Sequence, residues 1–317
     1  AGGQVAGWAS PADTNEELFL FRRLFREVLR SPHLDHRSAA IPDTEPDDTA
    51  LPIADIEGCD QVVVLGGQDV IDAAPVLHLR LFKSQRKGVN VLKIGASQVA
   101  EAVAGVRPDC TAVGILATEA NKTAAVELQT KLQRKIKGSV RRLLVTTGPN
   151  GRGAKDLGIL PHLGPGYAAL NGQAGTGRTE WPGAGLRALY IHESSPLHGF
   201  TPSDAESMWL PTLPLLVFHR FKPSPLDEMA HVVLPGHTFT EKDGTVTNME
   251  GRVQRIARGL DADWVLEDWR VFQELANGLG AAWTYDSVSD IAADLVRSLP
   301  PYAALNRGER VLWSEPA

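Results

Sequence analysis

The sequence contains little cysteine. Cys59 and Cys110 are the two cysteines among its 317 residues, and they stand far apart in the chain. Two distant thiols provide no disulfide framework, and an iron–sulfur cluster normally needs four cysteine ligands, often closely spaced. We interpret both cysteines as small buried hydrophobic side chains and expect a reducing, cytoplasmic environment.

Long apolar runs and a surplus of basic residues are also missing. No run approaches the roughly 20 apolar residues that cross a bilayer, and no charged-then-apolar leader opens the chain. The formal net charge is -6, whereas a nucleic-acid-binding domain normally concentrates basic residues on one face. These absences predict neither direct membrane insertion nor a nucleic-acid partner. Because the chain begins with Ala1 rather than methionine, we expect it to be cut from a longer protein.

Strand-like and helix-like segments occur along the chain, and those between 60 and 94 predict a parallel βαβ unit. Thr14 and Glu17 form a capping box that begins an amphipathic helix, and this helix should end near Ser31-Pro32. Further strands are predicted at 60–65, 89–94, 140–147, 186–191, 213–218 and 231–235, the last of them buried. Further helices are predicted at 75–87, 118–137, 265–279 and 288–299. The turn at Gly66-Gly67 lacks the Gly-x-Gly-x-x-Gly pattern, so nicotinamide dinucleotide binding is not indicated.

Two polar or glycine-rich stretches follow predicted strands. Glu241–Arg255 begins with a turn signal at Asp243-Gly244 and continues with hydrogen-bonding side chains that alternate with apolar or small residues. Such a stretch at the carboxyl end of a strand is either a ligand-binding loop or a hairpin that satisfies its own backbone. The second stretch, Gly148–Gly153, has glycines that let the backbone approach a ligand closely.

These stretches carry a family resemblance. Thr14–Arg37, Asn150–Tyr167 and Val232–Arg255 resemble segments of the molybdopterin oxidoreductase superfamily. They are similar above all to the member of that superfamily in the peripheral arm of bacterial NADH-quinone oxidoreductase (respiratory complex I). The resemblance covers roughly residues 7 to 299. It implies two Rossmann-like α/β units, a larger one from 1–37 and 137–299 and an inserted one from 38–136, with residues 300–317 as a tail.

The resemblance also locates a pterin cleft. It assigns the cleft to Asn150, Gly151, Arg152, Gly153, Thr247, Asn248, Glu250 and Arg252. The cysteine that ligates the metal in catalytic relatives has no counterpart between Ala1 and Gly58, which leaves Ser38 or Asp43 as alternatives. Bulky His192 and His219 also replace the family's usual residues at strand ends that contact the pterin dinucleotide.

We therefore expect a vestigial cleft with no catalytic residue, no metal and no cofactor. His33 and His36 invite a metal interpretation, but no third ligand stands near them in the sequence, so we do not favour it. The function expected first is an architectural part of complex I, packed against other hydrophilic-arm subunits and peripheral to the inner face of the cell membrane. Iron–sulfur clusters would lie in a separate N-terminal region. The alternative is a fragment of a formate dehydrogenase-like oxidoreductase that still binds molybdopterin.

Overall fold

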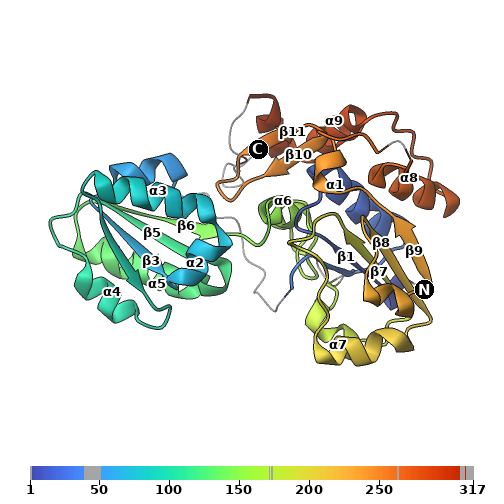
Figure 1. Ribbon diagram of the computed structural model, residues 1–317, viewed down its shortest axis with the longest axis horizontal. Helices are drawn as coiled ribbons and strands as arrows, with labels where there is room; N and C mark the ends of the chain where they lie inside the picture. Colours follow the sequence, from blue (N-terminus) through green and yellow to red (C-terminus); the bar gives the residue numbers. More distant parts are fainter. Residues whose placement is uncertain are drawn as a thin grey trace. The chain divides into compact units, whose positions relative to one another are not determined.

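A computed structural model describes residues 2–38, 51–170, 172, 174–262, 264–307 and 311 of the chain (Figure 1). The chain divides into two compact units: unit 1 is Ala1–Pro46 with Gly148–Ala317, and unit 2 is Asp47–Thr147. No described helix combines the length and the apolar character needed to cross a membrane.

Unit 1 is built on a five-stranded parallel sheet in the order β2-β1-β7-β8-β9. The strands are β1 (Val5–Ala9), β2 (His33–Asp35), β7 (Ala188–Glu193), β8 (Leu215–Arg220) and β9 (Val232–Pro235). Along the chain, β2 is added next to β1 on one side, and β7 is later added next to β1 on its other side. The carboxyl ends of β1 and β7 therefore form a topological switch point, where open α/β sheets bind ligands.

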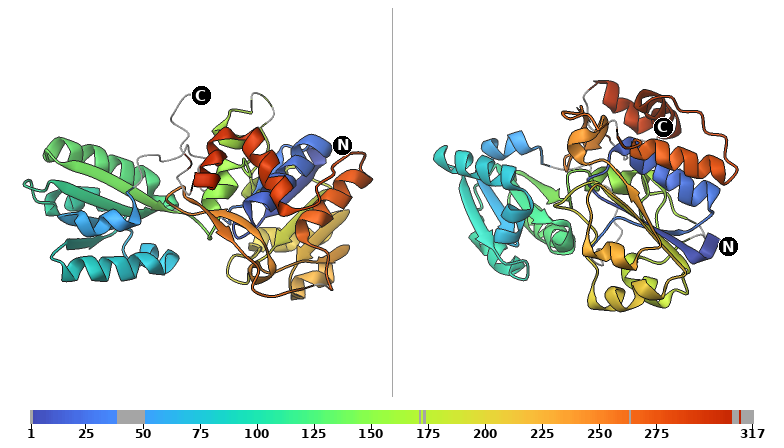
Figure 2. Two further views of the ribbon diagram at one scale, coloured as in Figure 1. Left: turned by 90° about the horizontal axis from the view of Figure 1, so that it is seen from above. Right: turned by 45° about the vertical axis from the view of Figure 1, so that its right-hand side comes forward.

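Helices cover both faces of this sheet (Figures 1 and 2). One face packs on α1 (Asn15–Arg23), α8 (Asp268–Gly278) and α9 (Val288–Ser298), and Tyr190 joins that core. The other face lies against η6 (Arg178–Gly183), α7 (Asp204–Trp209) and η7 (Leu210–Thr212), where Leu189 and Ile191 are buried. This alternation follows from the two-residue period of a strand. At the start of α1 the predicted capping box is confirmed, because the Thr14 hydroxyl and the Glu17 carboxylate each accept the other's backbone N–H.

Unit 2 repeats the design with four parallel strands in the order β4-β3-β5-β6. These are β3 (Gln61–Leu65), β4 (Asn90–Ile94), β5 (Ala112–Thr118) and β6 (Ser139–Val145). Figure 1 shows α2 (Gln68–Ala73) and α3 (Pro75–Arg86) on one face, and α4 (Val99–Gly105) and α5 (Lys122–Lys135) on the other. The α/β architecture of parallel sheets flanked by helices confirms the predicted fold class.

Shorter elements complete the chain. They are α6 (Gly151–Asp156), the hairpin β10 (Gly244–Thr247) and β11 (Val253–Ile256), and the short helices η1 (Gly2–Gln4), η2 (Leu24–Val28), η3 (Ile53–Gly58), η4 (Glu119–Asn121), η5 (Pro165–Tyr167), η8 (Pro225–Met229), η9 (Phe239–Glu241) and η10 (Pro300–Arg307).

Several local predictions need correction. The strand predicted at 140–147 was assigned to the larger unit, but it is β6, which pairs with β5 and belongs to unit 2. The strand predicted as buried, β9, lies at the edge of its sheet with Val232 and Val233 about two-fifths exposed. The hairpin turns at Asn248–Arg252 rather than at Asp243-Gly244, where β10 begins. In the segment assigned to a tail, η10 buries Tyr302 within the core of unit 1.

Candidate functional site

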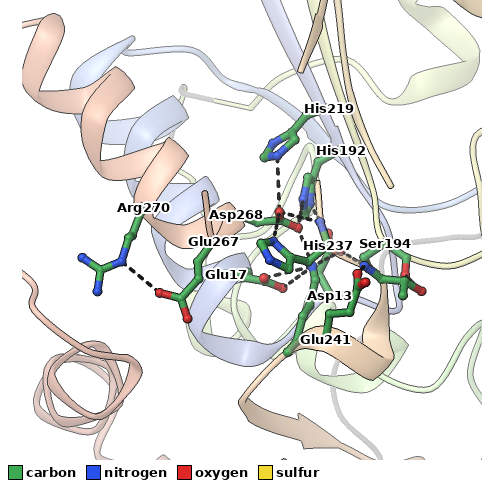
Figure 3. Close-up of polar contacts among 12 residues, drawn as sticks. Asp13, Glu17, His192, Ser194, His219, His237, Glu241, Glu267, Asp268 and Arg270 are labelled. Atoms are coloured by element: carbon green, nitrogen blue, oxygen red, sulfur yellow. Dashed lines mark hydrogen bonds and ion pairs between the residues drawn. The ribbon is translucent and has the colours of Figure 1, made fainter. Parts of the chain in front are cut away.

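A cluster of buried charged side chains lies at the carboxyl edge of the unit 1 sheet (Figure 3). We call it the Asp268 cluster; its members are Asp13, Glu17, His192, Ser194, His219, His237, Lys242 and Asp268, each no more than 5% exposed. His192 and His219 are register partners near the ends of β7 and β8, and His237 follows β9. Parallel strands end at one edge of the sheet, so side chains distant in sequence meet there.

His192 links two carboxylates within the cluster. Its Nδ1 lies 2.8 Å from Asp13 Oδ2, and its Nε2 lies 2.9 Å from Asp268 Oδ2. Burial disfavours a charged imidazole, but the two carboxylates outweigh burial and raise the pKa of His192 to about 10. His192 is therefore an imidazolium that donates a hydrogen bond from each ring nitrogen.

Asp268 is the hub of the cluster. It is the first residue of α8, where the helix dipole stabilises a negative charge. Its Oδ2 accepts the His192 bond and lies 2.7 Å from Lys242 Nζ, while its Oδ1 accepts the backbone N–H of His237 at 2.9 Å. Although burial alone would raise the pKa of Asp268, Lys242 and the neighbouring histidines hold it well below its usual range.

Lys242 brings a third carboxylate into the cluster. Its Nζ lies 2.9 Å from both oxygens of Glu17 and 3.9 Å from Asp13 Oδ1. Burial raises the pKa of Glu17, whereas the surrounding carboxylates overcome burial and raise the pKa of Lys242. A buried charge that loses its partner is strongly destabilising, so the cluster fixes α1, α8 and the strand ends together.

Two other imidazoles face Asp268 without a hydrogen bond. His219 Nε2 and His237 Nδ1 each lie 3.4 Å from Asp268 Oδ1, beyond the ordinary N–H···O range of about 2.7–3.2 Å. Both nitrogens are buried and have no hydrogen-bond partner among the described residues. Burial lowers the pKa of His219, whose other nitrogen lies 2.9 Å from the Tyr190 hydroxyl.

The two predicted cleft segments do meet, but as structural partners. Asn150 accepts the Thr247 N–H at 2.6 Å and donates to the Asp13 carbonyl at 2.7 Å. Asn15 donates to the hydroxyls of Thr245 and Thr247 at 3.0 and 3.1 Å. These bonds join α1, the hairpin and the residues before α6.

Glycine is required at Gly153 because a Cβ there would lie 2.2 Å from Asn150 Oδ1. Gly151, at the start of the same helix, is buried.

The remaining predicted cleft residues also bond within the protein. Arg152 Nε donates to Asp156 Oδ1 at 2.8 Å, in a buried ion pair. Asn248 Oδ1 accepts the backbone N–H groups of Glu250 and Arg252 at 3.0 and 2.9 Å, which closes the turn of the hairpin. The Asn150, Arg152, Thr247 and Asn248 side chains, which the resemblance assigned to a pterin cleft, thus bond within the local fold.

The two carboxyl edges differ in the space that they offer. In unit 1, a cavity of 180 Å³ lies beside the ends of β7 and β8, with Glu193 and Arg220 among its lining residues. A larger cavity of 820 Å³ lies away from the strand ends, between the hairpin and α9. In unit 2, a cavity of 570 Å³ lies at the ends of β4 and β5, lined by Ser97, Asn121 and Lys131 among others.

These volumes test whether a molybdopterin dinucleotide fits. Small-ligand sites usually occupy about 300–1,000 Å³, so the edge of unit 2 can hold the nucleotide end of such a group. The 180 Å³ cavity beside the ends of β7 and β8 is too small for it. No sequence signal singles out Ser97 or Asn121, because neither stands in a recognised motif.

Other sequence predictions can be checked individually. Cys59 and Cys110 are buried as predicted, and burial raises the pKa of Cys59 to about 11. His33 and His36 bond to separate backbone carbonyls, those of Gly3 and Ile159. Ser38 is exposed. Asp43 lies outside the described residues.

Comparison with known proteins gives a consistent family. The sequence model described as Molybdopterin oxidoreductase matches residues 95–278, more than half of the chain. The chain is 31% identical over 179 residues to the F420-dependent formate dehydrogenase 2 subunit alpha of Methanococcus maripaludis, covering 50% of this chain and 26% of that protein. It is 30% identical over 177 residues to the corresponding subunit of Methanocaldococcus jannaschii, with 49% and 26% covered.

A relative named for another activity is similar over about the same share of the chain. The NADPH-Fe(3+) oxidoreductase subunit alpha of Geobacter sulfurreducens is 27% identical over 184 residues, covering 53% of this chain and 22% of that protein. The chain therefore spans about a quarter of the length of the curated relatives that it matches. These relatives support the formate dehydrogenase-like interpretation better than the complex I interpretation.

Proposed function

Because this chain belongs to the molybdopterin oxidoreductase family, we propose that it forms part of the large subunit of a formate dehydrogenase-like oxidoreductase and binds molybdopterin. The observation that carries this proposal is the open carboxyl edge of unit 2, a cavity of 570 Å³ on a Rossmann-like sheet. The similarity to formate dehydrogenase alpha subunits agrees with it.

The residues around this cavity suit a nucleotide. Ser97 and Thr123 offer hydroxyls, Asn121 offers an amide, and Lys131 offers a cation for a phosphate. Asn121 lies against Gly66, where a Cβ would come within 2.8 Å of its Nδ2, so the backbone there is already close-packed. When bound, molybdopterin supplies the metal redox centre, and these residues would hold its nucleotide end.

Pterin release tests the proposal. Purified protein is denatured under oxidising conditions, and the fluorescent pterin is measured together with molybdenum and tungsten. We expect about one pterin per chain, and a several-fold reduction in Asn121→Leu, since a typical hydrogen bond contributes about 0.5–1.5 kcal/mol. Arg258→Ala, on the surface of unit 1, is the control and should leave the yield unchanged. Absence of pterin from protein produced in a host that makes the cofactor would overturn the proposal.

A second candidate is the architectural role in the peripheral arm of complex I. It is favoured by the hydrogen bonds that the predicted cleft residues form with one another, above all those of Asn150 with Thr247 and of Asn248 with Arg252. In that role the partners are other hydrophilic-arm subunits, and the protein lies in the cytoplasm at the inner face of the cell membrane.

Co-expression with those hydrophilic-arm subunits tests this role. A stoichiometric complex without molybdenum, tungsten or pterin is expected, and a full complement of metal and pterin would contradict it.

A further inference from the structure

We propose that His192, His219, His237 and Asp268 form a binding site for a zinc-class divalent cation. Ligand atoms of His192, His219 and Asp268 lie within 4.8 Å of one another, and His237 Nδ1 lies 3.4 Å from Asp268 Oδ1. Three imidazoles and one carboxylate are a ligand set that zinc and its first-row neighbours favour. Figure 3 shows these side chains converging from β7, β8, the segment after β9 and the start of α8.

The 3.4 Å distances from His219 Nε2 and His237 Nδ1 to Asp268 Oδ1 match the spacing of ligands around a metal ion. They are longer than ordinary hydrogen bonds of about 2.7–3.2 Å, and His219 Nε2 and His237 Nδ1 are buried with no other hydrogen-bond partner among the described residues. Two ligands of a tetrahedral zinc ion, each bound at about 2.05 Å, stand roughly 3.3 Å apart. A cation in contact with Asp268 Oδ1 would satisfy both nitrogens at these distances.

Each histidine also has a partner that orients it. His192 Nδ1 lies 2.8 Å from Asp13 Oδ2, His219 Nδ1 lies 2.9 Å from the Tyr190 hydroxyl, and His237 interacts with the Ala262 backbone. Metal-ligating histidines almost always direct their second nitrogen to a carboxylate, hydroxyl or carbonyl, which fixes the tautomer and the ring. The first nitrogen of each ring then faces Asp268.

Charge balance agrees with a divalent ion. The cluster contains three carboxylates, those of Asp13, Glu17 and Asp268. They pair with two cations, His192 and Lys242. Binding would replace the proton on His192 Nε2 with the metal ion and release that proton to solvent. The ion and Lys242 would then match the three carboxylates. Lys242 keeps Glu17 at 2.9 Å as a partner when Asp268 turns to the metal.

Zinc titration of the full chain tests the site. Chelator-treated, desalted protein is titrated with Zn²⁺ by calorimetry in two buffers of different ionisation enthalpy. We expect one ion per chain and about one proton released per ion, because His192 must deprotonate to bind. Cobalt substitution should give the strong visible absorption of a tetrahedral centre, which an ion held by surface carboxylates would not give.

Variants separate this site from adventitious binding. His219→Gln and His237→Gln should each weaken Zn²⁺ binding at least tenfold, and Asp13→Asn should weaken it about 10- to 100-fold through the orientation of His192. His198→Gln, on the loop after β7 and outside the cluster, is the matched control and should bind like the parent. Tryptophan fluorescence verifies that each variant is folded. Equal affinity in the parent and both ligand variants, or an equal loss in the control, would overturn the proposal.

Discussion

Units 1 and 2 place their first strand at the same point of a parallel sheet, with β1 between β2 and β7 and β3 between β4 and β5. Buried side chains nevertheless pack the carboxyl edge of unit 1, whereas the carboxyl edge of unit 2 leaves a cavity. In unit 1 the edge holds His192, His219 and Asp268, all fully buried. In unit 2 the corresponding edge carries Gly95, Ala96 and Ser97 and opens into a cavity of 570 Å³.

This contrast shows that one topology can serve two purposes. Strand order determines where a ligand could bind, whereas the size and charge of the strand-end side chains determine whether space remains. Unit 1 uses its edge for a charge network that holds helices to the sheet. Unit 2 keeps its edge available to a ligand. Substitutions at one edge, compared with substitutions elsewhere in the molecule, test this distinction.

The largest expected effect is that of removing the hub of the Asp268 cluster. Asp268→Asn leaves the cations His192 and Lys242 short of a buried carboxylate, which should lower the free energy of unfolding of unit 1 by about 3–5 kcal/mol. All seven tryptophans of the sequence lie in unit 1, so denaturant unfolding followed by tryptophan fluorescence reports on that unit.

An exposed carboxylate provides the control for this change. Asp286→Asn alters an acid that is exposed, just before α9, and should change stability by no more than about 0.5 kcal/mol. A similar small effect for Asp268→Asn would mean that the cluster contributes little to holding unit 1 together.

A pH-dependent effect is expected from Glu16, which is buried where α1 meets the hairpin. Burial raises the pKa of Glu16 to about 7, although Thr245 donates to its carboxylate through both N–H and hydroxyl. Between the unfolded value of 4.5 and about 7, the folded state keeps a proton that the unfolded state loses. Stability therefore falls as pH rises through this window, by about 3 kcal/mol for this group alone.

Glu16→Gln removes the titrating group and keeps an oxygen that can accept from Thr245. Unfolding of the parent and the variant is compared at about pH 4.5 and about pH 7.5, on either side of the window. As pH rises, the free energy of unfolding of the variant should increase relative to that of the parent. Parallel pH profiles for the two proteins would show that Glu16 titrates normally in the folded state.

The sequence predicted the periodic elements well because their signals are local. The capping box of Thr14 and Glu17, the helix at α3 and the strand at β3 depend on neighbours within a few residues. It missed β5 of unit 2 and also β1, a short interior strand of unit 1 whose Val5–Ala9 run includes Gly7 and small residues. The placement of β1 depends on pairing with β2 and β7, which local propensity does not encode.

The site was harder to predict for the same reason. His192 and His219 do lie near strand ends, but their meeting with His237 and Asp268 requires the register of three strands and the start of a distant helix. The sequence predicted no metal site because those four residues are scattered. Asn150 and Thr247 were brought together as the family pattern implies, while their mutual bond became visible only with side-chain positions.

The smallest expected effects come from placing the same substitution at the two edges. Ser194 is fully buried and its hydroxyl donates to Asp13, whereas Ser97 is exposed and lines the unit 2 cavity. Ser194→Leu must overfill a packed site and remove a bond, so it should destabilise unit 1 by about 2 kcal/mol. Ser97→Leu enters open space and should change the stability of unit 2 by less than about 0.5 kcal/mol. Tryptophan fluorescence measures the first change, and hydrogen exchange of peptides from β3 and β5 measures the second. If the two serines respond alike, the edges are equally packed, and the distinction between a filled edge and an open one is wrong.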